Sequence, residues 1–294
     1  MIDRASLADF LRSRRTALRP EDVGLPRGQR RRTSGLRREE AAMLSNMSVD
    51  YYARLERERG PQPSDQMLAS IAQGLRLTIA ERDHLFRLAG HEPPTAASGG
   101  DHVSPGTMRI FDRLADSPAE IVTELGETLQ QTALAAELTG DASGRRGDDR
   151  SIGYRWFADP GSRGVHPVED HPFLSRMYAS GLRTVIARRG PGSRAAHLAE
   201  RLLASSAEFR EVWARHEVGI RPRDVKHYRH PEVGLLTLQC QVLQDPDSSQ
   251  ALLVYTAEPG SESAERLRLL SVIASSGAVG LLGDRLPLAP GREP

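Results

Sequence analysis

Cysteine is almost missing from this chain of 294 residues, which has a single one, Cys240. One thiol excludes an internal disulfide and a metal site built from clustered cysteines. Cys240 stands in the run GLLTLQCQVL, whose alternation of apolar and polar residues is typical of a β-strand. We therefore expect a packed structural thiol rather than a nucleophile.

Long hydrophobic runs are missing as well. No stretch of eighteen apolar residues occurs, and the first residues, MIDRASLADFLRSRR, lack the apolar core of a signal peptide. A hydrophobic share of 38% and a charged share of 27% are typical of globular proteins, and the length suffices for two domains. The sequence predicts no membrane segment and a location in the cytoplasm, associated with the nucleoid.

The signatures of common catalytic and metal sites are also missing. The chain has no HExxH, GxSxG, phosphate loop or dinucleotide fingerprint. Pro231 disfavours a helix that would bring His227 and His230 together, so we expect structural or surface roles for them and for His216. The sequence predicts no enzyme, no metal and no resident cofactor. An enzyme in the second half stays open as an alternative.

Lysine is scarce, since only Lys226 among the forty basic residues is a lysine. Arginine suits phosphates and guanine edges, although the coding composition of a genome gives the same bias. Residues 1–90 have seventeen arginines against twelve acids, and residues 91–294 have twenty-three basic residues against twenty-seven acids. A basic first part on an acidic second part predicts that the first part meets a polyanion.

Proline and glycine mark one clear break, HEPPTAASGGDHVSPG at residues 91–106, which we interpret as a linker. Residues 1–90 predict an all-α domain with helices at 6–18, 36–45, 49–58, 64–75 and 79–90. Residues 107–284 predict a small α+β domain with strands near 119–132, 234–243 and 250–259 and helices at 133–140, 171–189, 193–218 and 263–276. Residues 150–160 give no clear pattern, and residues 285–294 are expected to form a loose tail.

The second and third of these helices have the pattern of a helix-turn-helix, in which one helix braces another that enters the major groove of DNA. The bracing helix has three apolar positions, Leu36, Met43 and Leu44. Asn46 stands at the turn, where asparagine tolerates a left-handed backbone, and Ser48 is a good N-cap for the next helix. At 100° per residue, Tyr52 and Leu55 lie on its buried side, and Glu56 and Glu58 fall on its flanks.

The opposite side of that helix holds Asp50, Ala53, Arg54 and Arg57. We interpret it as a face that reads DNA, because arginine can grip guanine and Asp50 can accept from cytosine or orient Arg54 at the i+4 position. Tyr51, at its margin, can hydrogen-bond a phosphate. The alternative is a helical hairpin whose charges form only a solvated face.

The loop before the bracing helix favours DNA. PRGQRRRTSGLRR, residues 26–38, has six arginines and no acid, so it can neutralise phosphates or place an arm in the minor groove. The residues predicted to contact DNA are Arg27, Arg30, Arg31, Arg32, Arg37, Ser48, Val49, Asp50, Tyr51, Arg54 and Arg57. We expect a homodimer on double-stranded DNA, since paired heads bind half-sites about one helical turn apart. A head that binds RNA polymerase or a partner regulator without reading DNA is the alternative.

With these residues in view, the sequence resembles the MmyB-like transcription regulators, which pair an Xre-type helix-turn-helix with a PAS-like ligand-binding domain. The resemblance lies in GLRREEAAMLSNMSVDYYARLERERGPQPS, AERDHLFRLAG, YRWFADP, SAEFREVWARHEV and HPEVGLLTLQCQVL, and spans roughly residues 5 to 275. It implies a regulator of transcription whose second domain senses a small molecule, with a medium- or long-chain fatty acid as the suggested ligand. Two departures are Asn46 in place of a glycine, and Gln130 and Gln131 where many members have Trp-Asn.

A sensor site is expected to be an apolar pocket with a few polar groups. The bulky residues of the second half that could line it are Leu129, Leu134, Tyr154, Trp156, Phe157, Phe173, Met177 and Trp213. Each of them can equally belong to an ordinary core, and the sequence does not separate the two roles.

Overall fold

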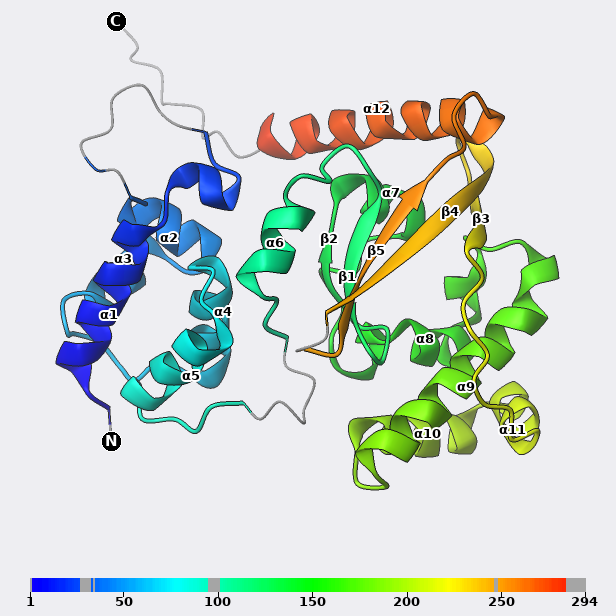
Figure 1. Ribbon diagram of the computed structural model, residues 1–294, viewed down its shortest axis with the longest axis horizontal. Coiled ribbons are helices and arrows are strands. Elements are labelled where there is room, and N and C mark those ends of the chain that lie inside the picture. Colours follow the sequence, from blue (N-terminus) through cyan, green and yellow to red (C-terminus); the bar gives the residue numbers. More distant parts are fainter. Residues whose placement is uncertain (1, 27–32, 34, 95–100, 246–247, 284–294) are drawn as a thin grey trace, which may run out of the picture. The chain divides into compact units, whose positions relative to one another are not determined.

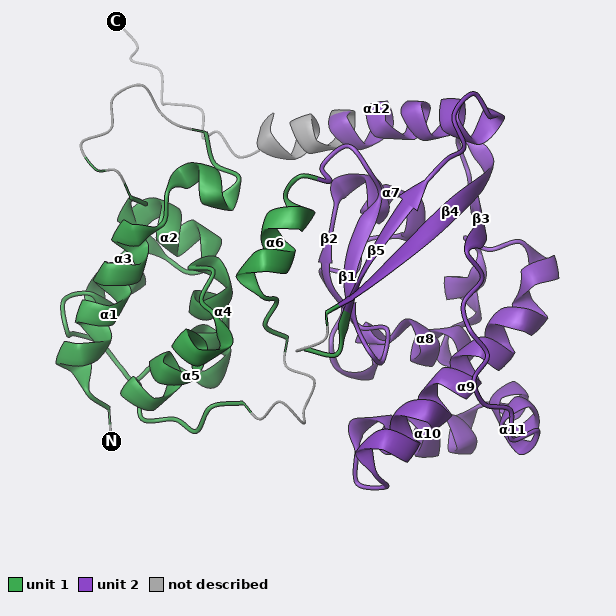
Figure 2. Ribbon diagram, in the orientation of Figure 1, with its two compact units in different colours: residues 1–113, 245–250 green, residues 114–244, 251–294 purple. Residues whose placement is uncertain are grey.

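The computed structural model describes residues 2–26, 33, 35–94, 101–245 and 248–283, with side chains as far as residue 275. The chain divides into two compact units, one of residues 1–113 with 245–250 and one of residues 114–244 with 251–294 (Figure 2). Residues 101–113 thus group with the first unit, whereas the sequence analysis begins the second domain at residue 107. Each unit is described below by itself.

The first unit consists of short helices. They are α1 (Arg4–Ala17), the 3-10 turn η1 (Pro20–Val23), α2 (Arg38–Leu44), α3 (Val49–Leu55), α4 (Asp65–Gly74), α5 (Ile79–Leu88) and α6 (Pro105–Phe111) (Figure 1). The five predicted helices are confirmed, and the starts of α1, α3, α4 and α5 follow from side-chain caps. Ser64 accepts from the amide of Met67, and Thr78 forms a capping box with Glu81.

The core of the first unit is aliphatic, with one aromatic residue from α3 and one from α5. Its fully buried members include Leu11, Leu36, Tyr52, Leu68, Ile71, Leu85 and Phe86. Met43, one of the three apolar positions of the bracing helix, is 59% exposed. Helix α2 begins at Arg38 and turns Ala41 and Ala42 inward, so the close contact is made by two small residues.

The second unit is an α+β domain, as predicted. It is built around a five-stranded sheet. Its strands are β1 (Ala119–Thr123), β2 (Thr128–Gln131), β3 (Val225–His230), β4 (Gly234–Asp245) and β5 (Gln250–Thr256), in the order β2-β1-β5-β4-β3. The pairs β1–β2 and β3–β4 are antiparallel. Strand β3 was not predicted, because its run VKHYRH is charged and alternates only at Tyr228 and His230, which are buried.

The helices of the second unit are α7 (Ala133–Thr139), α8 (Ile152–Ala158), α9 (His171–Arg189), α10 (Arg194–Ser205), α11 (Ala207–Ala214) and α12 (Glu262–Gly283). Helices α7 and α12 pack with β4 and β5 around Leu134, Leu236, Leu238 and Leu270. Helices α8 to α11 form a second cluster around Trp156, Leu198, Leu202 and Phe209. The stretch 193–218 divides into α10 and α11 at Ser206, whose hydroxyl caps α11. Residues 150–160, left open by the sequence, contribute α8.

Candidate functional site

The start of α3 lies at the surface of the first unit. Asn46 has a φ of 50°, the left-handed conformation expected at this turn, and Ser48 accepts a hydrogen bond from the amide of Tyr51 at 3.2 Å. Ser48, Val49 and Asp50 are exposed, and Val49 keeps 43% of its surface in solvent. An apolar residue exposed at a helix start is available for contact with a partner surface.

Asp50 and Arg54 form the ion pair expected at the i+4 position, with 3.2 Å between Oδ2 and Nη2. The Arg54 guanidinium also lies 5.9 Å from the centroid of the Tyr51 ring. The pair is largely exposed, so it adds little to stability and leaves the guanidinium free to exchange partners. Arg54 is thus presented at the surface beside Asp50 and Tyr51. Whether it touches DNA stays a prediction.

Helix α3 is shorter than the predicted range 49–58. It ends at Leu55, and Arg57 lies in the turn that follows, where its amide donates to the carbonyl of Arg54. Arg57 is exposed and lies beyond the end of the helix that carries Asp50 and Arg54. Glu58 has a φ of 62°, which no continuing right-handed helix allows.

Glu56, placed on a solvent-facing flank by the sequence analysis, is instead completely buried. Its carboxylate accepts hydrogen bonds from Arg15 of α1 and, at 2.7 Å, from Arg38 at the start of α2. Burial works against the charge of Arg15, but the hydrogen bond and charge of Glu56 raise its pKa overall. Arg15 also donates to the carbonyl of Leu36. One carboxylate therefore ties α1, α2 and the end of α3 together.

Gly74 allows α4 to approach the turn between α2 and α3. A Cβ at this position would lie 2.7 Å from the carbonyl oxygen of Leu44 and 2.7 Å from the hydroxyl of Ser45. No side chain fits there without moving backbone. This contact and the Glu56 ion pairs fix the position of α3 against α1, α2 and α4.

Of the predicted arginine loop, Arg27, Arg30, Arg31 and Arg32 lie outside the described residues. Arg37 is exposed and is the residue before α2, where its amide donates to the Glu40 carboxylate at 2.7 Å. The predicted contacts of these five arginines with DNA stay predictions.

The second unit contains a cavity of about 530 Å³. Helices α8 to α11 contribute a mainly apolar wall, which includes Trp156, Phe157, Leu174, Met177, Leu198, Leu202 and Phe209. The sheet contributes a more polar wall, with Glu120, Thr128 and Gln131 from β1 and β2, and Lys226, Tyr228 and Tyr255 from β3 and β5. Its size suits a small organic molecule.

Five of the eight residues proposed as ligand contacts line this cavity, namely Tyr154, Trp156, Phe157, Phe173 and Met177. Leu129, Leu134 and Trp213 are not among its lining residues. Leu134 packs in the core under the sheet, and Trp213 stacks on Phe209 with 5.1 Å between ring centroids. That the five contact a ligand stays a prediction.

Two hydrogen bonds hold Trp156 on the cavity wall. Its indole nitrogen donates to Ser175 at 2.8 Å, and Ser175 donates to Glu208 at 2.6 Å. Partial burial works against the charge of Glu208, but hydrogen bonds from Arg163 and Ser175 lower its pKa overall. The carboxylate therefore remains ionised and can accept the hydrogen bond from Ser175, which in turn orients the Trp156 ring.

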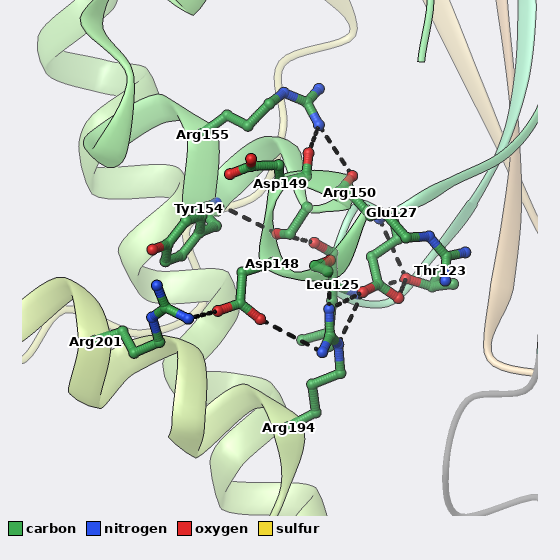
Figure 3. A network of polar contacts seen from close by, with 12 residues as sticks. Thr123, Leu125, Glu127, Asp148, Asp149, Arg150, Tyr154, Arg155, Arg194 and Arg201 are labelled. Carbon is green, nitrogen blue, oxygen red and sulfur yellow. Dashed lines mark hydrogen bonds and ion pairs between the residues drawn. The ribbon is translucent and has the colours of Figure 1, made fainter. Parts of the chain in front are cut away.

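Ion pairs fix the loop that leads into α8 (Figure 3). Arg194 lies 2.9 Å from Glu127, and Arg201 lies 2.7 Å from Asp148 in the 3-10 turn η3 (Gly147–Arg150). Ser151 then caps α8 through the amide of Tyr154. Figure 3 shows the Arg155 side chain apart from these ion pairs.

Charged residues in the cavity wall were not foreseen as site residues. Glu120 and Arg155 are each 8% exposed, and Gln131, noted in the sequence only as a departure, donates to Glu120 at 2.8 Å. An arginine inside the aromatic run GYRWFA was a signal for Arg155. No sequence signal marked Glu120, which stands in an ordinary strand pattern.

His166, also on the cavity wall, is neutral near pH 7. Burial lowers its pKa to about 4, although a hydrogen bond with the carbonyl of His227 raises it in part. Within the described residues there is no group of three or more His, Cys, Asp or Glu that could hold a metal ion. No described helix is long and apolar enough to cross a membrane.

Two family models match the chain. Residues 103–270 match a model described as the MmyB-like transcription regulator ligand binding domain, and residues 6–85 match one described as a helix-turn-helix domain. The comparison with curated proteins gave no match. The first match covers the cavity and the second covers α1 to α4 and most of α5.

Proposed function

Because this chain belongs to the MmyB-like transcription regulators, we propose that it reads specific DNA sequences under the control of a small apolar, fatty-acid-like effector. The family makes it a helix-turn-helix regulator of transcription with a ligand-binding domain, and not an enzyme. The specificity for DNA sequence and the chemical nature of the effector are the parts that we add. Such a protein acts where the chromosome is, in the cytoplasm.

The exposed start of α3 supports the reading of DNA. Asp50 and Arg54 are presented at the surface by a helix whose opposite side is tied down by Tyr52, Leu55 and Glu56. Bidentate contacts of arginine with guanine are the commonest specific contacts in the major groove. We assign base readout to Arg54 and Asp50, and phosphate contacts to Arg57, Arg30, Arg31 and Arg32.

We further propose that the protein acts as a homodimer, because one small head gives modest affinity and two heads bind paired half-sites. Sequencing of duplexes selected from a random pool by the full chain tests the proposal. The expected result is a motif that recurs twice with centres about 10 base pairs, or a multiple, apart. Binding to RNA polymerase without any recurrent motif would favour the protein-interaction alternative.

The cavity supports the control by an effector. Its apolar wall can bury a hydrocarbon chain, and each buried methylene contributes about 0.8 kcal/mol to binding. Mass spectrometry of small molecules released from the purified full chain tests the effector directly. An acyl compound at close to one per chain supports the proposal. A hydrophilic metabolite in its place would contradict the fatty-acid-like class.

A further inference from the structure

The cavity of the second unit holds two buried charges that its proposed hydrocarbon ligand would leave without partners. Glu120 of β1 and Arg155 of α8 both line it, and both are only 8% exposed. A buried charge costs several kcal/mol unless it is paired and hydrogen-bonded. The partners of these two side chains therefore indicate what the cavity is built to receive.

The Glu120 carboxylate is held by neutral groups only. Its Oε1 atom accepts from Gln131 Nε2 at 2.8 Å and from Thr139 Oγ1 at 2.7 Å. Within the described residues, Glu120 forms no ion pair and no hydrogen bond through Oε2. One carboxylate oxygen is thus fixed by β2 and α7, and the other can accept a hydrogen bond from a donor.

The Arg155 guanidinium is held by carbonyl groups. Its Nη1 atom donates to the main-chain oxygens of Asp149 and Arg150 in η3, at 2.5 and 3.0 Å, which fixes the position of the group. No carboxylate among the described residues pairs with it. Burial and the charge of Arg145 lower its pKa, whereas Tyr178 and the charges of Asp149 and Glu120 raise it in part and favour the charged form. Arg155 therefore carries a positive charge with unused donors on the cavity wall.

Glu120 and Arg155 face a common space. Tyr178 of α9 also lines the cavity, and burial raises its pKa, with Arg155 lowering it and Glu120 raising it in part. Glu120 likewise contributes to the raised pKa values of Tyr228 and Tyr255, after burial. The hydroxyl of Tyr178 forms no hydrogen bond within the described residues. Tyr178, Glu120 and Arg155 thus line one cavity, and the two charges act on the phenol in opposite directions.

We propose that Glu120, Arg155 and Tyr178 form a head-group subsite, and that the effector is a long-chain acid with a hydrogen-bond donor beside its carboxylate, as in a 3-hydroxy acid. The ligand carboxylate pairs with Arg155, and the adjacent hydroxyl donates to Glu120 Oε2. Tyr178 donates to the same carboxylate, and the hydrocarbon chain lies against the helical wall. The inference rests on the proposed control by an acyl effector and adds the head group to it.

The chemistry disfavours a plain fatty acid. A carboxylate placed beside Arg155 without a donor stands near the Glu120 carboxylate, where two like charges repel each other and Oε2 stays without a partner. A hydroxyl on the ligand removes the cost of leaving Glu120 Oε2 without a partner, because it donates to that oxygen. A site built to hydrogen-bond a hydroxyl rejects analogues that lack it far more strongly than an apolar pocket rejects a missing methylene.

Calorimetric titration of the full chain, freed of bound lipid, with dodecanoic acid, 3-hydroxydodecanoic acid and dodecanol tests the subsite. We expect 3-hydroxydodecanoic acid to bind at least about tenfold tighter than dodecanoic acid, and dodecanol to bind weakest. Equal affinity for the two acids would overturn the inference. Failure of all three probes to bind would instead contradict the proposed acyl effector itself.

Substitutions at two positions, Glu120 and Arg155, assign the groups. Glu120→Gln should bring the affinities for the two acids to within about threefold of each other, because the amide no longer favours the ligand hydroxyl. Arg155→Gln should weaken both acids by at least about tenfold and leave dodecanol unchanged, whereas Arg155→Lys should retain part of the affinity for acids. Glu211→Gln and Arg109→Gln, both at exposed positions, are the matched controls.

Dodecanol, which has no carboxylate, distinguishes a binding role of Arg155 from a structural one. If Arg155→Gln weakened dodecanol as much as the acids, Arg155 would act only by holding η3 and α8 in place, and the inference would fail. If Arg155→Gln did not fold, Arg155→Lys and Glu120→Gln would still test the subsite. Arg155→Lys keeps the positive charge, and Glu120→Gln keeps nearly the shape of the side chain. A preference for 3-hydroxydodecanoic acid that survives Glu120→Gln would also overturn it.

Discussion

Glu56 is the single side chain on which the geometry of the first unit depends most. Its carboxylate is completely buried between Arg15 of α1 and Arg38 of α2, which come from positions far apart in the chain. Removing one partner of a buried ion pair leaves the other charge without compensation. The consequence is a large effect on stability from a residue that touches no proposed DNA contact.

We expect Glu56→Gln to lower the free energy of unfolding of the first unit by about 3 kcal/mol, because Arg15 keeps a buried charge without a carboxylate. Hydrogen exchange of amides in residues 4–88, followed by mass spectrometry, measures the loss. Glu58→Gln, at the next exposed acid, is the control and should change little. Unchanged protection in Glu56→Gln would show that the buried pair adds nothing to stability.

Arg54 is the residue to which we assign base readout. Arg54→Ala should cost about 1–3 kcal/mol of binding free energy at the selected operator and relax the preference at one base position. Selection from a random pool with the variant measures both effects. Arg87→Ala, an exposed arginine of α5, is the control. A motif that stays the same at every position would remove Arg54 from base readout.

His166 predicts a pH dependence of the second unit. Its pKa is about 4 in the folded chain against 6.5 for an unperturbed histidine, so the unfolded chain binds more protons between these pH values. The free energy of unfolding should therefore fall as the pH is lowered from 6.5 to 4, by at most about 3 kcal/mol from this group. His171, Asp170 and Lys226 also act on it.

Urea unfolding at several pH values, followed by tryptophan fluorescence, measures this dependence, because Trp156 and Trp213 both lie in the second unit. His166→Gln should flatten the curve between pH 4 and 6.5. His197→Gln, at an exposed position of α10, should leave it as it is. The same slope in both variants would assign the pH dependence to other groups.

At the scale of elements, Asp245 at the end of β4 and Gln250 at the start of β5 group with the first unit. Asp245 accepts from Thr107 of α6 at 3.2 Å, and Gln250 donates to the carbonyl of His102 at 3.0 Å. The His102 ring in turn hydrogen-bonds the carbonyl of Leu77, and Val103 donates to Gln73 of α4. Strand β5 continues from Gln250 into residues that line the cavity, Ala251, Leu253 and Tyr255. Gln250 thus stands where the chain passes from hydrogen bonds of the first unit into a strand of the cavity wall.

Gln250→Ala should therefore reduce the change in DNA affinity that the effector causes, by about 1 kcal/mol, and leave the affinity without effector within about twofold. Titration of operator DNA with and without saturating effector measures the coupling. Ser261→Ala, in the loop before α12, is the control. If coupling were unchanged in Gln250→Ala, the hydrogen bond to His102 would have no part in the response.

The elements also show where sequence patterns suffice. The five predicted helices of the first unit are marked by local caps such as Ser48, Ser64 and Thr78, and these depend only on neighbouring residues. The burial of Glu56 depends on Arg15, 41 positions away, so no local pattern reveals it. Leu134 and Trp156 were both candidates for the cavity wall because both are bulky and apolar. Leu134 packs under the sheet, whereas Trp156 lines the cavity. That difference arises from tertiary packing alone.

At the scale of the whole molecule, charge is divided between the two parts of the chain. The basic excess lies in residues 1–90, and neutral substitution of Arg30, Arg31 and Arg32 should weaken binding to all DNA sequences and lower the salt slope by about 3. Fluorescence titrations at several salt concentrations measure the slope. Arg221→Gln, Arg223→Gln and Arg229→Gln together, from the acidic second part, are the control. A slope that did not change would remove the arginine loop from the interface.

The separation of roles on α3 makes this regulator a suitable scaffold for new specificities. Tyr52, Leu55 and Glu56 hold the helix and Ser48 caps it, whereas Val49, Asp50 and Arg54 are presented to the outside. A library that varies only the outward residues would leave every buried contact of the helix unchanged. Operators could then be exchanged while the cavity continues to report the same small molecule, which is the design of an interchangeable biosensor.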